Sequence, residues 1–542
     1  MKTNIFSKIG LISLVGMSLF SCKKKSDGPS VPPTAPPEIT TREQLTQDSI
    51  FLYGKEVYLW NTSLPTYQVF NPRQYAGTLD GFNQELIALT RYSPVNTATG
   101  KPYETPLSGG GSKYSYIDDV STHNVLANRQ EEKSSVDLEG IGNDFGLKLG
   151  AYSGASANAY TIYVQAVYPG SPADKANITR GARLTKINTV SYGANYDNEV
   201  NALNSALNAS EMTVEGVGKD GIAPINVVLK KTSYRSSPIY AKKVLEVGGI
   251  KVGYLAYARF SSMSNSQTEF DAAFAEFAAQ GVTKLVIDLR YNGGGYVNTA
   301  EYLVNLISPS SNNGKVMFKE RYNTLMQTGT ATILKNQPLF NDDGTLQQFQ
   351  GRVANYGDLE KDYFSESKQV SNFSKKGPLE GVTDVVFIVT RGTASASELV
   401  INSLKPHLTV KIAGTKSYGK PVGFFPIKIN YKKDAATGKE SGYDVYYSMF
   451  QTTNSLGQGD YFDGFTPDLT MTFDDASHDF GDLREGNLAG ALSLIVPTVP
   501  SPTASTMSIR GNNVRVNATT TKSIFDGNEF NGMIADRPRL KK

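Results

Sequence analysis

The sequence predicts an α/β layered core that follows a helical N-terminal region and a β-rich unit. Three observations favour this fold class. Strand patterns alternate with amphipathic helical patterns within residues 240–497. Strand patterns dominate residues 138–231, and apolar residues recur at three-to-four spacing within residues 41–135. Alternating strands and helices are typical of a sheet covered by helices, so residues 240–497 are expected to hold the core.

Composition excludes several classes of function. The 542 residues are 39% hydrophobic and 19% charged, which is typical of a soluble globular protein. The net charge is only +3 and no basic stripe occurs, so nucleic acid is not expected as a partner. No clustered His, Cys and carboxylate spacing indicates a metal site, and no phosphate loop is present. We therefore expect no cofactor.

The first residues have the pattern of a targeting segment. Two lysines precede a short apolar run at residues 9–20, which ends in Leu-Phe-Ser-Cys. Cys22 is the only cysteine, so no internal disulfide is possible. The segment resembles a bacterial lipobox, whose cysteine is lipidated; an ordinary signal peptide with a chance cysteine is the alternative. We expect a lipoprotein signal peptide over residues 1–22, a Pro-rich tether over residues 23–40, and membrane anchorage through Cys22.

The next two regions are predicted to differ in structure. Within residues 41–135, helices are expected at 44–60 and 81–89, followed by an exposed loop rich in Gly, Ser and Thr at 95–115. Within residues 138–231, strands are expected at 160–167, 212–216 and 225–229, with a helix at 198–207.

The β-rich unit also carries short glycine motifs. They are Gly-Ile-Gly at 140–142, Ser-Pro-Ala-Asp-Lys-Ala at 171–176 and Gly-Ala-Arg-Leu-Thr-Lys-Ile-Asn at 181–188. These segments resemble the PDZ domain of bacterial proteases. The resemblance implies that an extended peptide adds to a sheet edge, with its carboxylate held by N–H groups of Gly140, Ile141 and Gly142. A Rossmann interpretation of these glycines is weak, because no strand–helix unit surrounds them.

Three buried strands predicted within residues 240–497 each lead to a segment that can carry chemistry. The strands are 284–290, 384–389 and 408–413, with helices expected at 266–279, 300–307 and 399–404. Strand ends in α/β sheets open into loops where ligands bind, so the three following segments are expected to share one site. Residues 310–380 have the pattern of an insertion that forms a lid or strand arm.

Two of these segments contain a nucleophile and a base. Ser395 lies in Thr-Ala-Ser-Ala-Ser-Glu, and Lys420 follows 25 residues later. A serine hydroxyl needs a base, and a lysine serves only if burial lowers its pKa from about 10.4, which the small and apolar neighbours of Lys420 favour. Three alternatives stay open: Ser395 and Glu398 also form a capping box, Ser397 is a competing serine, and His407 offers a histidine-based mechanism.

In combination these motifs resemble the C-terminal processing peptidases, or tail-specific proteases. The resemblance rests on Asp-Leu-Arg-Tyr-Asn-Gly-Gly-Gly at 288–295, Thr-Ala-Ser-Ala-Ser-Glu at 393–398, Gly-Thr-Lys-Ser-Tyr-Gly-Lys at 414–420 and Gly-Phe-Thr-Pro-Asp at 464–468. It covers about residues 136–467 and implies a crotonase-like layered protease core with a PDZ domain. The N-terminal region is similar to lipoprotein members from bacteria of the Bacteroides group.

The resemblance also implies the role of each site residue. Ser395 would be the nucleophile and Lys420 the general base. Backbone N–H groups of Ala396 and Gly294 (or Gly295) would form the oxyanion hole, which stabilises developing negative charge. Glu398 would orient the site. The Asp288 and Arg290 side chains are expected to hold in place the glycine loop, residues 293–295. No metal is implied.

The predicted function is therefore a serine endopeptidase of the cell envelope, acting on unfolded or C-terminally tagged proteins that the PDZ domain recognises. A catalytically inactive peptide-binding lipoprotein is the main alternative, and a carbohydrate-binding outer-membrane lipoprotein is another. Residues 498–542 form a polar tail without an assigned role. No pattern predicts the substrates, the membrane face or the oligomeric state.

Overall fold

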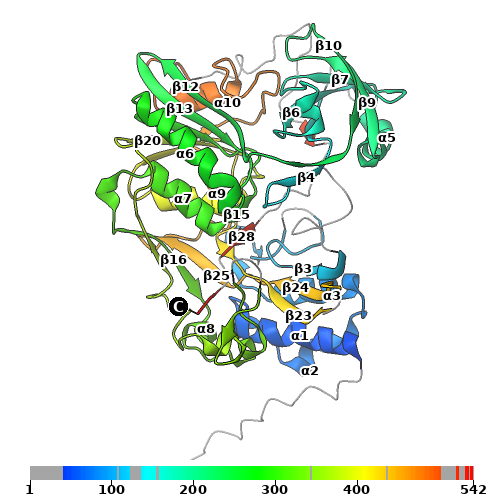
Figure 1. The fold of residues 1–542 in the computed structure, drawn as a ribbon, viewed down its shortest axis with the longest axis vertical. Coiled ribbons are helices and arrows are strands. Elements are labelled where there is room, and N and C mark those ends of the chain that lie inside the picture. The colour runs from blue at the N-terminus through cyan, green and yellow to red at the C-terminus, as the bar shows by residue number, and fades with distance from the viewer. Residues whose placement is uncertain are drawn as a thin grey trace, which may run out of the picture. The chain divides into compact units, whose positions relative to one another are not determined.

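A six-stranded sheet organises the part of the chain that the computed structural model describes (Figure 1). The described residues are 41–106, 109–122, 136–153, 158–341, 345–434, 437–501, 521–523, 532–535 and 538–540. The predicted signal peptide, the tether and Cys22 lie outside them. Within the described ranges, no helix combines the length and apolar character needed to cross a bilayer.

The central sheet has the order β12-β13-β14-β20-β21-β26. Its strands are β12 Ile239–Val247, β13 Ile250–Tyr257, β14 Lys284–Asp288, β20 Asp384–Val389, β21 Thr409–Gly414 and β26 Leu469–Thr470. All neighbours from β13 onward are parallel, while β12 pairs antiparallel with β13. The three strands predicted to lead into the site are therefore adjacent, and their carboxyl ends meet at one edge.

Helices cover both faces of this sheet. Successive strand residues point to opposite faces. Alternate residues of β14 and β20 accordingly belong to two different hydrophobic clusters, one on each face of the sheet. Leu285, Ile287 and Phe387 pack in the cluster that includes α6 Met263–Ala279, α7 Val297–Ile307 and α9 Ala396–Leu404. Val286, Val386 and Ile388 pack in the cluster that includes α10 Gly486–Ser493. The predicted layered α/β core is confirmed by this arrangement.

The β-rich unit contains a second sheet, of order β10-β9-β7-β6-β5-β27, with β8 paired to β7. Its strands are β5 Leu147–Ser153, β6 Tyr160–Val167, β7 Arg183–Ile187, β8 Val190–Ser191, β9 Glu211–Val217, β10 Pro224–Lys230 and β27 Thr521–Ser523. Helices α4 Pro172–Lys175 and α5 Tyr196–Asn208 accompany it, and its apolar residues form a separate cluster. A pair of strands, β4 Ile141–Asp144 and β11 Thr232–Arg235, joins the two ends of the unit.

The N-terminal helices share the main hydrophobic cluster of the core. They are α1 Arg42–Val57, α2 Tyr67–Phe70 and α3 Leu79–Thr90, with 3₁₀ turns η1 Asn61–Ser63 and η2 Pro72–Gln74 between them. Threonines cap all three helices, and Thr41 forms a capping box with Gln44. They pack near the sheet of β23 Ile427–Lys433, β24 Glu440–Tyr446 and β3 Tyr116–Asp119. Two distant parts of the sequence therefore build one layer (Figure 1).

The expectation of an exposed loop at residues 95–115 is wrong for its second half. A short hairpin, β1 Val95–Asn96 and β2 Lys101–Pro102, is largely exposed. Glu104 and residues 112–115 are buried, because the Glu104 carboxylate accepts hydrogen bonds from the hydroxyls of Ser112, Ser115 and Ser448. Polar composition indicated exposure here, whereas these polar groups satisfy one another inside the protein.

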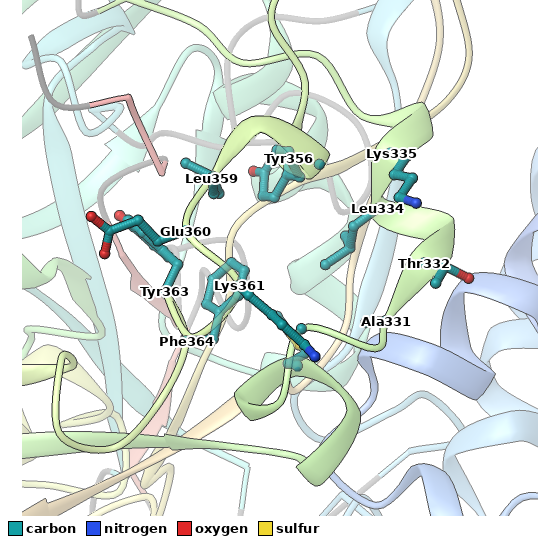
Figure 2. Close-up of a pocket in the computed structure, with 13 residues that line it drawn as sticks. Ala331, Thr332, Leu334, Lys335, Tyr356, Leu359, Glu360, Lys361, Tyr363 and Phe364 are labelled. Carbon is teal, nitrogen blue, oxygen red and sulfur yellow. The ribbon is translucent and has the colours of Figure 1, made fainter.

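The insertion at residues 310–380 adds strands to the side of the core. Its elements are η4 Ser310–Asn312, β16 Val316–Tyr322, α8 Thr324–Gln327, η5 Thr332–Asn336, β17 Gln348–Phe349, β18 Arg352–Val353, η6 Tyr356–Asp358 and β19 Val370–Asn372. Strand β16 joins β19 to β25 Phe450–Asn454, which pairs with β22 Val422–Gly423. A cavity of about 170 Å³ lies between η5 and the segment 356–364 (Figure 2). None of the predicted catalytic residues lines it.

Two short segments of the polar tail form strands. Strand β27 pairs antiparallel with β5, at the edge of the second sheet. Strand β28 Gly532–Ile534 pairs parallel with β15 Gly294–Tyr296, which belongs to the predicted glycine loop. The sequence pattern assigned these segments no structure.

Candidate active site

The three predicted site segments meet beyond the carboxyl ends of β14, β20 and β21. The glycine loop follows β14, Ser395 follows β20, and Lys420 follows β21. The Thr393 side chain donates to the Leu289 carbonyl oxygen at 2.7 Å, and the Tyr418 N–H donates to the Thr393 carbonyl oxygen at 2.9 Å. The expected convergence of these segments is therefore observed.

Ser395 is buried and has a strained backbone conformation. It is fully buried and has a φ of 62° and a ψ of −111°. Non-glycine residues rarely adopt positive φ, and such strain concentrates at functional sites. Ser395 and Glu398 have the arrangement of a capping box, but the Ser395 hydroxyl makes no hydrogen bond with a described residue. The competing Ser397 hydroxyl donates to the Asn292 carbonyl oxygen at 3.1 Å.

Lys420 is enclosed by aromatic side chains. It is 1% exposed, and its Nζ lies 4.7 Å from the ring centre of Phe424 and 5.7 Å from that of Tyr114. The Lys420 Nζ donates to the carbonyl oxygen of Tyr114 at 3.4 Å. The Tyr114 hydroxyl in turn donates to the Gly419 carbonyl oxygen at 2.6 Å. The sequence pattern missed Tyr114, because it lies far from the motifs in a segment expected to be an exposed loop.

Glu398 connects the serine helix to the lysine loop. Its Oε2 accepts the N–H of Ser395 at 2.9 Å and of Lys420 at 2.8 Å. Its Oε1 accepts the Ser417 hydroxyl at 2.6 Å and the Gly419 N–H at 2.8 Å. Burial raises the pKa of the Glu398 carboxyl, while these donors oppose that rise. Glu398 therefore links the two loops through backbone and side-chain donors on both of them.

The glycine loop approaches the serine segment through positive-φ residues. Gly294 and Gly295 have φ values of 112° and 136°. The Gly294 N–H donates to the Asn292 side-chain oxygen at 2.9 Å, and the Asn292 amide donates to the Tyr257 carbonyl oxygen at 3.1 Å. No described residue accepts a hydrogen bond from the Ala396 N–H. In this conformation, the Gly294 N–H is engaged within the loop.

A buried charge cluster supports the base of the glycine loop. Arg290 pairs with Asp288 at 2.7 Å and with Glu485 at 2.8 Å. Arg180, from the β-rich unit, pairs with Asp474 at 2.8 Å and donates to the Tyr291 hydroxyl at 2.8 Å.

The two arginines of the cluster act on the pKa of Asp474. Burial alone would raise the pKa of Asp474, but Arg180 and Arg290 hold it below its ordinary value. Asp288 and Arg290 thus have the structural surroundings expected. Arg180, Asp474 and Glu485 carried no recognisable motif.

The remaining predicted residues lie elsewhere. Residues Gly140, Ile141 and Gly142 lie at the start of β4, where the Ile141 N–H donates to Asp137 Oδ1 at 2.7 Å. His407 contacts the Ser455 hydroxyl at 3.1 Å and packs against the Phe373 ring. Among the described residues, no group of His, Cys, Asp and Glu side chains has the arrangement of a metal site.

Comparisons with known proteins bear on the core in particular. Residues 251–471 match the model of Peptidase family S41. A chloroplastic C-terminal processing peptidase of Tetradesmus obliquus is 25% identical over 340 residues, which cover 60% of this chain and 59% of that protein. A CtpA-like serine protease of Staphylococcus aureus is 25% identical over 286 residues, covering 52% and 46%. The chain thus spans about half the length of the curated relatives it matches.

One solved structure has a similar fold. It is the crystal structure of an S41 protease candidate from Bacteroides fragilis, with a TM-score of 0.50 and 20% identity, covering 85% of this chain and 98% of that chain. At this identity the likeness concerns the fold. Residues 251–471 are thus similar to Peptidase family S41, and the chain is similar in sequence to a C-terminal processing peptidase and a CtpA-like serine protease.

Proposed function

We propose that this protein is a serine endopeptidase in which Ser395 is the nucleophile and Lys420 the general base. One observation carries the proposal: the strained Ser395 has an unpartnered, buried hydroxyl, and Glu398 links its backbone to that of Lys420. A buried polar group without a partner costs free energy, and such costs are concentrated at functional sites.

In the proposed reaction, the Ser395 hydroxyl oxygen attacks the carbonyl carbon of the scissile peptide bond. The neutral Lys420 amine accepts the hydroxyl proton and then delivers it to the departing amine nitrogen, which leaves an acyl-enzyme. Water, deprotonated by the same amine, then attacks the ester carbonyl. The bond to the Ser395 oxygen breaks, Lys420 returns the proton to that oxygen, and the acid product leaves. The N–H of Ala396 stabilises the oxyanion in both steps, together with that of Gly295 or with that of Gly294 after it leaves the Asn292 side chain.

The proposed substrates are unfolded or C-terminally tagged proteins of the cell envelope. The name of the T. obliquus relative supports C-terminal processing. The β-rich unit is proposed to act as a PDZ domain that selects substrate C-termini through Gly140, Ile141 and Gly142, because its order of strands and helices suits a peptide added at a sheet edge. A lipid anchor at Cys22 would hold the protein on a bacterial membrane, facing the periplasm or the exterior.

Cleavage of a denatured reporter protein by four purified full-length variants tests the proposal. We expect Ser395→Ala and Lys420→Ala to lose cleavage, while Ser403→Ala, a buried serine in the same helix whose hydroxyl also lacks a partner, keeps it. Lys411→Ala is the lysine control, because the Lys411 side chain is 41% exposed and its pair with Asp468 lies at the surface. Wild-type turnover in both Ser395→Ala and Lys420→Ala would refute the dyad. No cleavage by any variant, with peptide binding retained, would favour an inactive peptide-binding lipoprotein.

A further inference from the structure

A segment of the chain's own tail lies against the proposed catalytic loops. Strand β28 pairs parallel with β15 on one side, and the Gly532 N–H donates to the Gly293 carbonyl oxygen at 3.2 Å. On the other side, the Phe424 N–H donates to the Met533 carbonyl oxygen, and the Ala535 N–H donates to the Phe424 carbonyl oxygen, both at 3.1 Å. Residues 532–535, the tail segment, thus lie between the glycine loop and the chain that follows Lys420.

The tail segment passes close to the nucleophile. A β-carbon added at Gly294 would lie 2.4 Å from the Gly532 carbonyl oxygen and 3.0 Å from the Ser395 β-carbon. One small volume is therefore bounded by the glycine loop, the serine and a tail carbonyl group. A peptide substrate of this site must bring its own carbonyl group to the same place.

The side chains of the tail segment are buried on opposite faces. Met533 is fully buried in the main hydrophobic cluster. Ile534 is 6% exposed and packs with Leu138, Phe424 and Tyr446. Strand addition gains affinity from main-chain hydrogen bonds and selectivity from the sites that receive alternate side chains. Both kinds of contact are present here.

A second tail segment has the same relationship to the β-rich unit. Strand β27 adds antiparallel to the edge strand β5, with Lys522 opposite Ala151. A peptide ligand of a PDZ domain also adds to a sheet edge. The tail therefore pairs with the glycine loop of the proposed active site and with an edge strand of the β-rich unit.

We propose that residues 532–535 are an intramolecular ligand of the substrate position, and that the substrates which displace them are extended segments with two successive apolar side chains after a small residue. This inference rests on the proposed function for the identity of the site. The tail segment lowers the apparent affinity for substrate, because only molecules with the segment displaced can bind.

A binding experiment tests the inference without relying on turnover. The probe is a fluorescently labelled peptide with the sequence of residues 531–536, added to full-length protein that carries Ser395→Ala. We compare the unchanged tail with Ile534→Asp, which places a charge among apolar side chains and expels the segment, and with Gly532→Pro, which removes the N–H donor to Gly293. Leu456→Asp, at a side chain that is 68% exposed, is the matched control.

We expect either tail variant to bind the peptide about tenfold more tightly than the unchanged chain or the Leu456→Asp control. A probe with Asp at the position of Ile534 should bind to none of them. Equal binding to all four proteins would overturn the inference, as would no binding to a tail variant that keeps the wild-type melting temperature.

A parallel assay separates this inference from the proposed function. With Ser395 intact, both tail variants should cleave denatured casein faster than the control at subsaturating substrate. If tighter peptide binding occurs without any cleavage, the catalytic proposal fails and the assignment of the tail segment stands. If cleavage occurs at the same rate in all proteins and peptide binding is equal, the tail segment is not a ligand and the catalytic proposal stands.

Discussion

Ser395 and Lys420 donate their backbone N–H groups to the same carboxylate oxygen of Glu398, at 2.9 and 2.8 Å. One buried side chain therefore sets the separation of two loops that follow different strands. The other Glu398 oxygen accepts hydrogen bonds from the Ser417 hydroxyl and the Gly419 N–H. Both carboxylate oxygens therefore act as hydrogen-bond acceptors for the two loops. This relationship makes Glu398 a positioning residue for both proposed catalytic groups.

Glu398→Gln should lower kcat by about 100-fold with little change in KM, because an amide NH₂ group facing N–H donors shifts both loops. Steady-state kinetics on a denatured reporter measures this split. Glu380→Gln, at an exposed carboxylate that accepts the Ser310 N–H, should leave kcat unchanged. An unchanged kcat in Glu398→Gln would remove its positioning role.

Gly294→Ala should abolish cleavage and lower stability. The new β-carbon would lie 2.4 Å from the Gly532 carbonyl oxygen and 3.0 Å from the Ala394 carbonyl oxygen, in a backbone with a φ of 112°. Gly281→Ala separates the two effects, because Gly281 has a φ of 71° and open space around it. The control should lose only about 1 kcal/mol by urea unfolding and keep its activity. Equal losses in both variants would mean that close approach at Gly294 is unimportant.

Arg180→Gln should destabilise the protein by about 3–5 kcal/mol, because it leaves Asp474 buried without one of its two arginine partners. Lys219→Gln is the matched control: Lys219 also links the β-rich unit to the chain near Asp474, through an exposed pair with Asp479 at 2.9 Å. Its loss should cost less than about 1 kcal/mol. Urea unfolding followed by tryptophan fluorescence measures both, and a similar small effect in the two variants would contradict the prediction.

The Asp475–His478 pair should make stability depend on pH. The hydrogen bond that His478 donates to the Asp475 carboxylate raises the pKa of His478 above its ordinary 6.5, and His478 Nδ1 lies 2.8 Å from Asp475 Oδ2. A raised folded-state pKa gives stability that is fully present below pH 6.5 and is lost as the pH rises through the raised value. The melting temperature of the unchanged protein should exceed that of His478→Gln more at about pH 6 than at about pH 9. A constant difference would show that the pair does not titrate in this range.

The core and the catalytic candidates could be predicted because local sequence determines them. Buried runs such as residues 284–288 and 384–389 are read directly as strands, and the segments after them must meet at one sheet edge. The choice between nucleophile and helix cap at Ser395 could not be made from the motif, since both use the same residues. The positive φ of Ser395 and its unpartnered hydroxyl, which favour the nucleophile, depend on tertiary packing.

The missed residues depend on contacts across long sequence separations. Arg180 meets Asp474 only after the β-rich unit docks on the core, and neither residue lies in a periodic pattern. Tyr114 reaches Lys420 because Glu104 gathers buried hydroxyls around its segment, a set that composition alone assigns to a surface loop. The tail segment is short and lies in a polar stretch of sequence, so no local pattern predicts its burial. It is buried because β28 pairs with β15.

The pairing of β4 with β11 has a consequence for modularity. Ile141 lies opposite Arg235 and Asp144 opposite Thr232, so the polypeptide leaves the core and returns to it at neighbouring points. An insertion whose ends are adjacent can be removed, or exchanged for an unrelated fold, without stretching the scaffold that receives it. Replacement of residues 145–231 by a different domain would thus preserve the chain connections of this scaffold, provided that the new domain supplies a cation for Asp474 in place of Arg180.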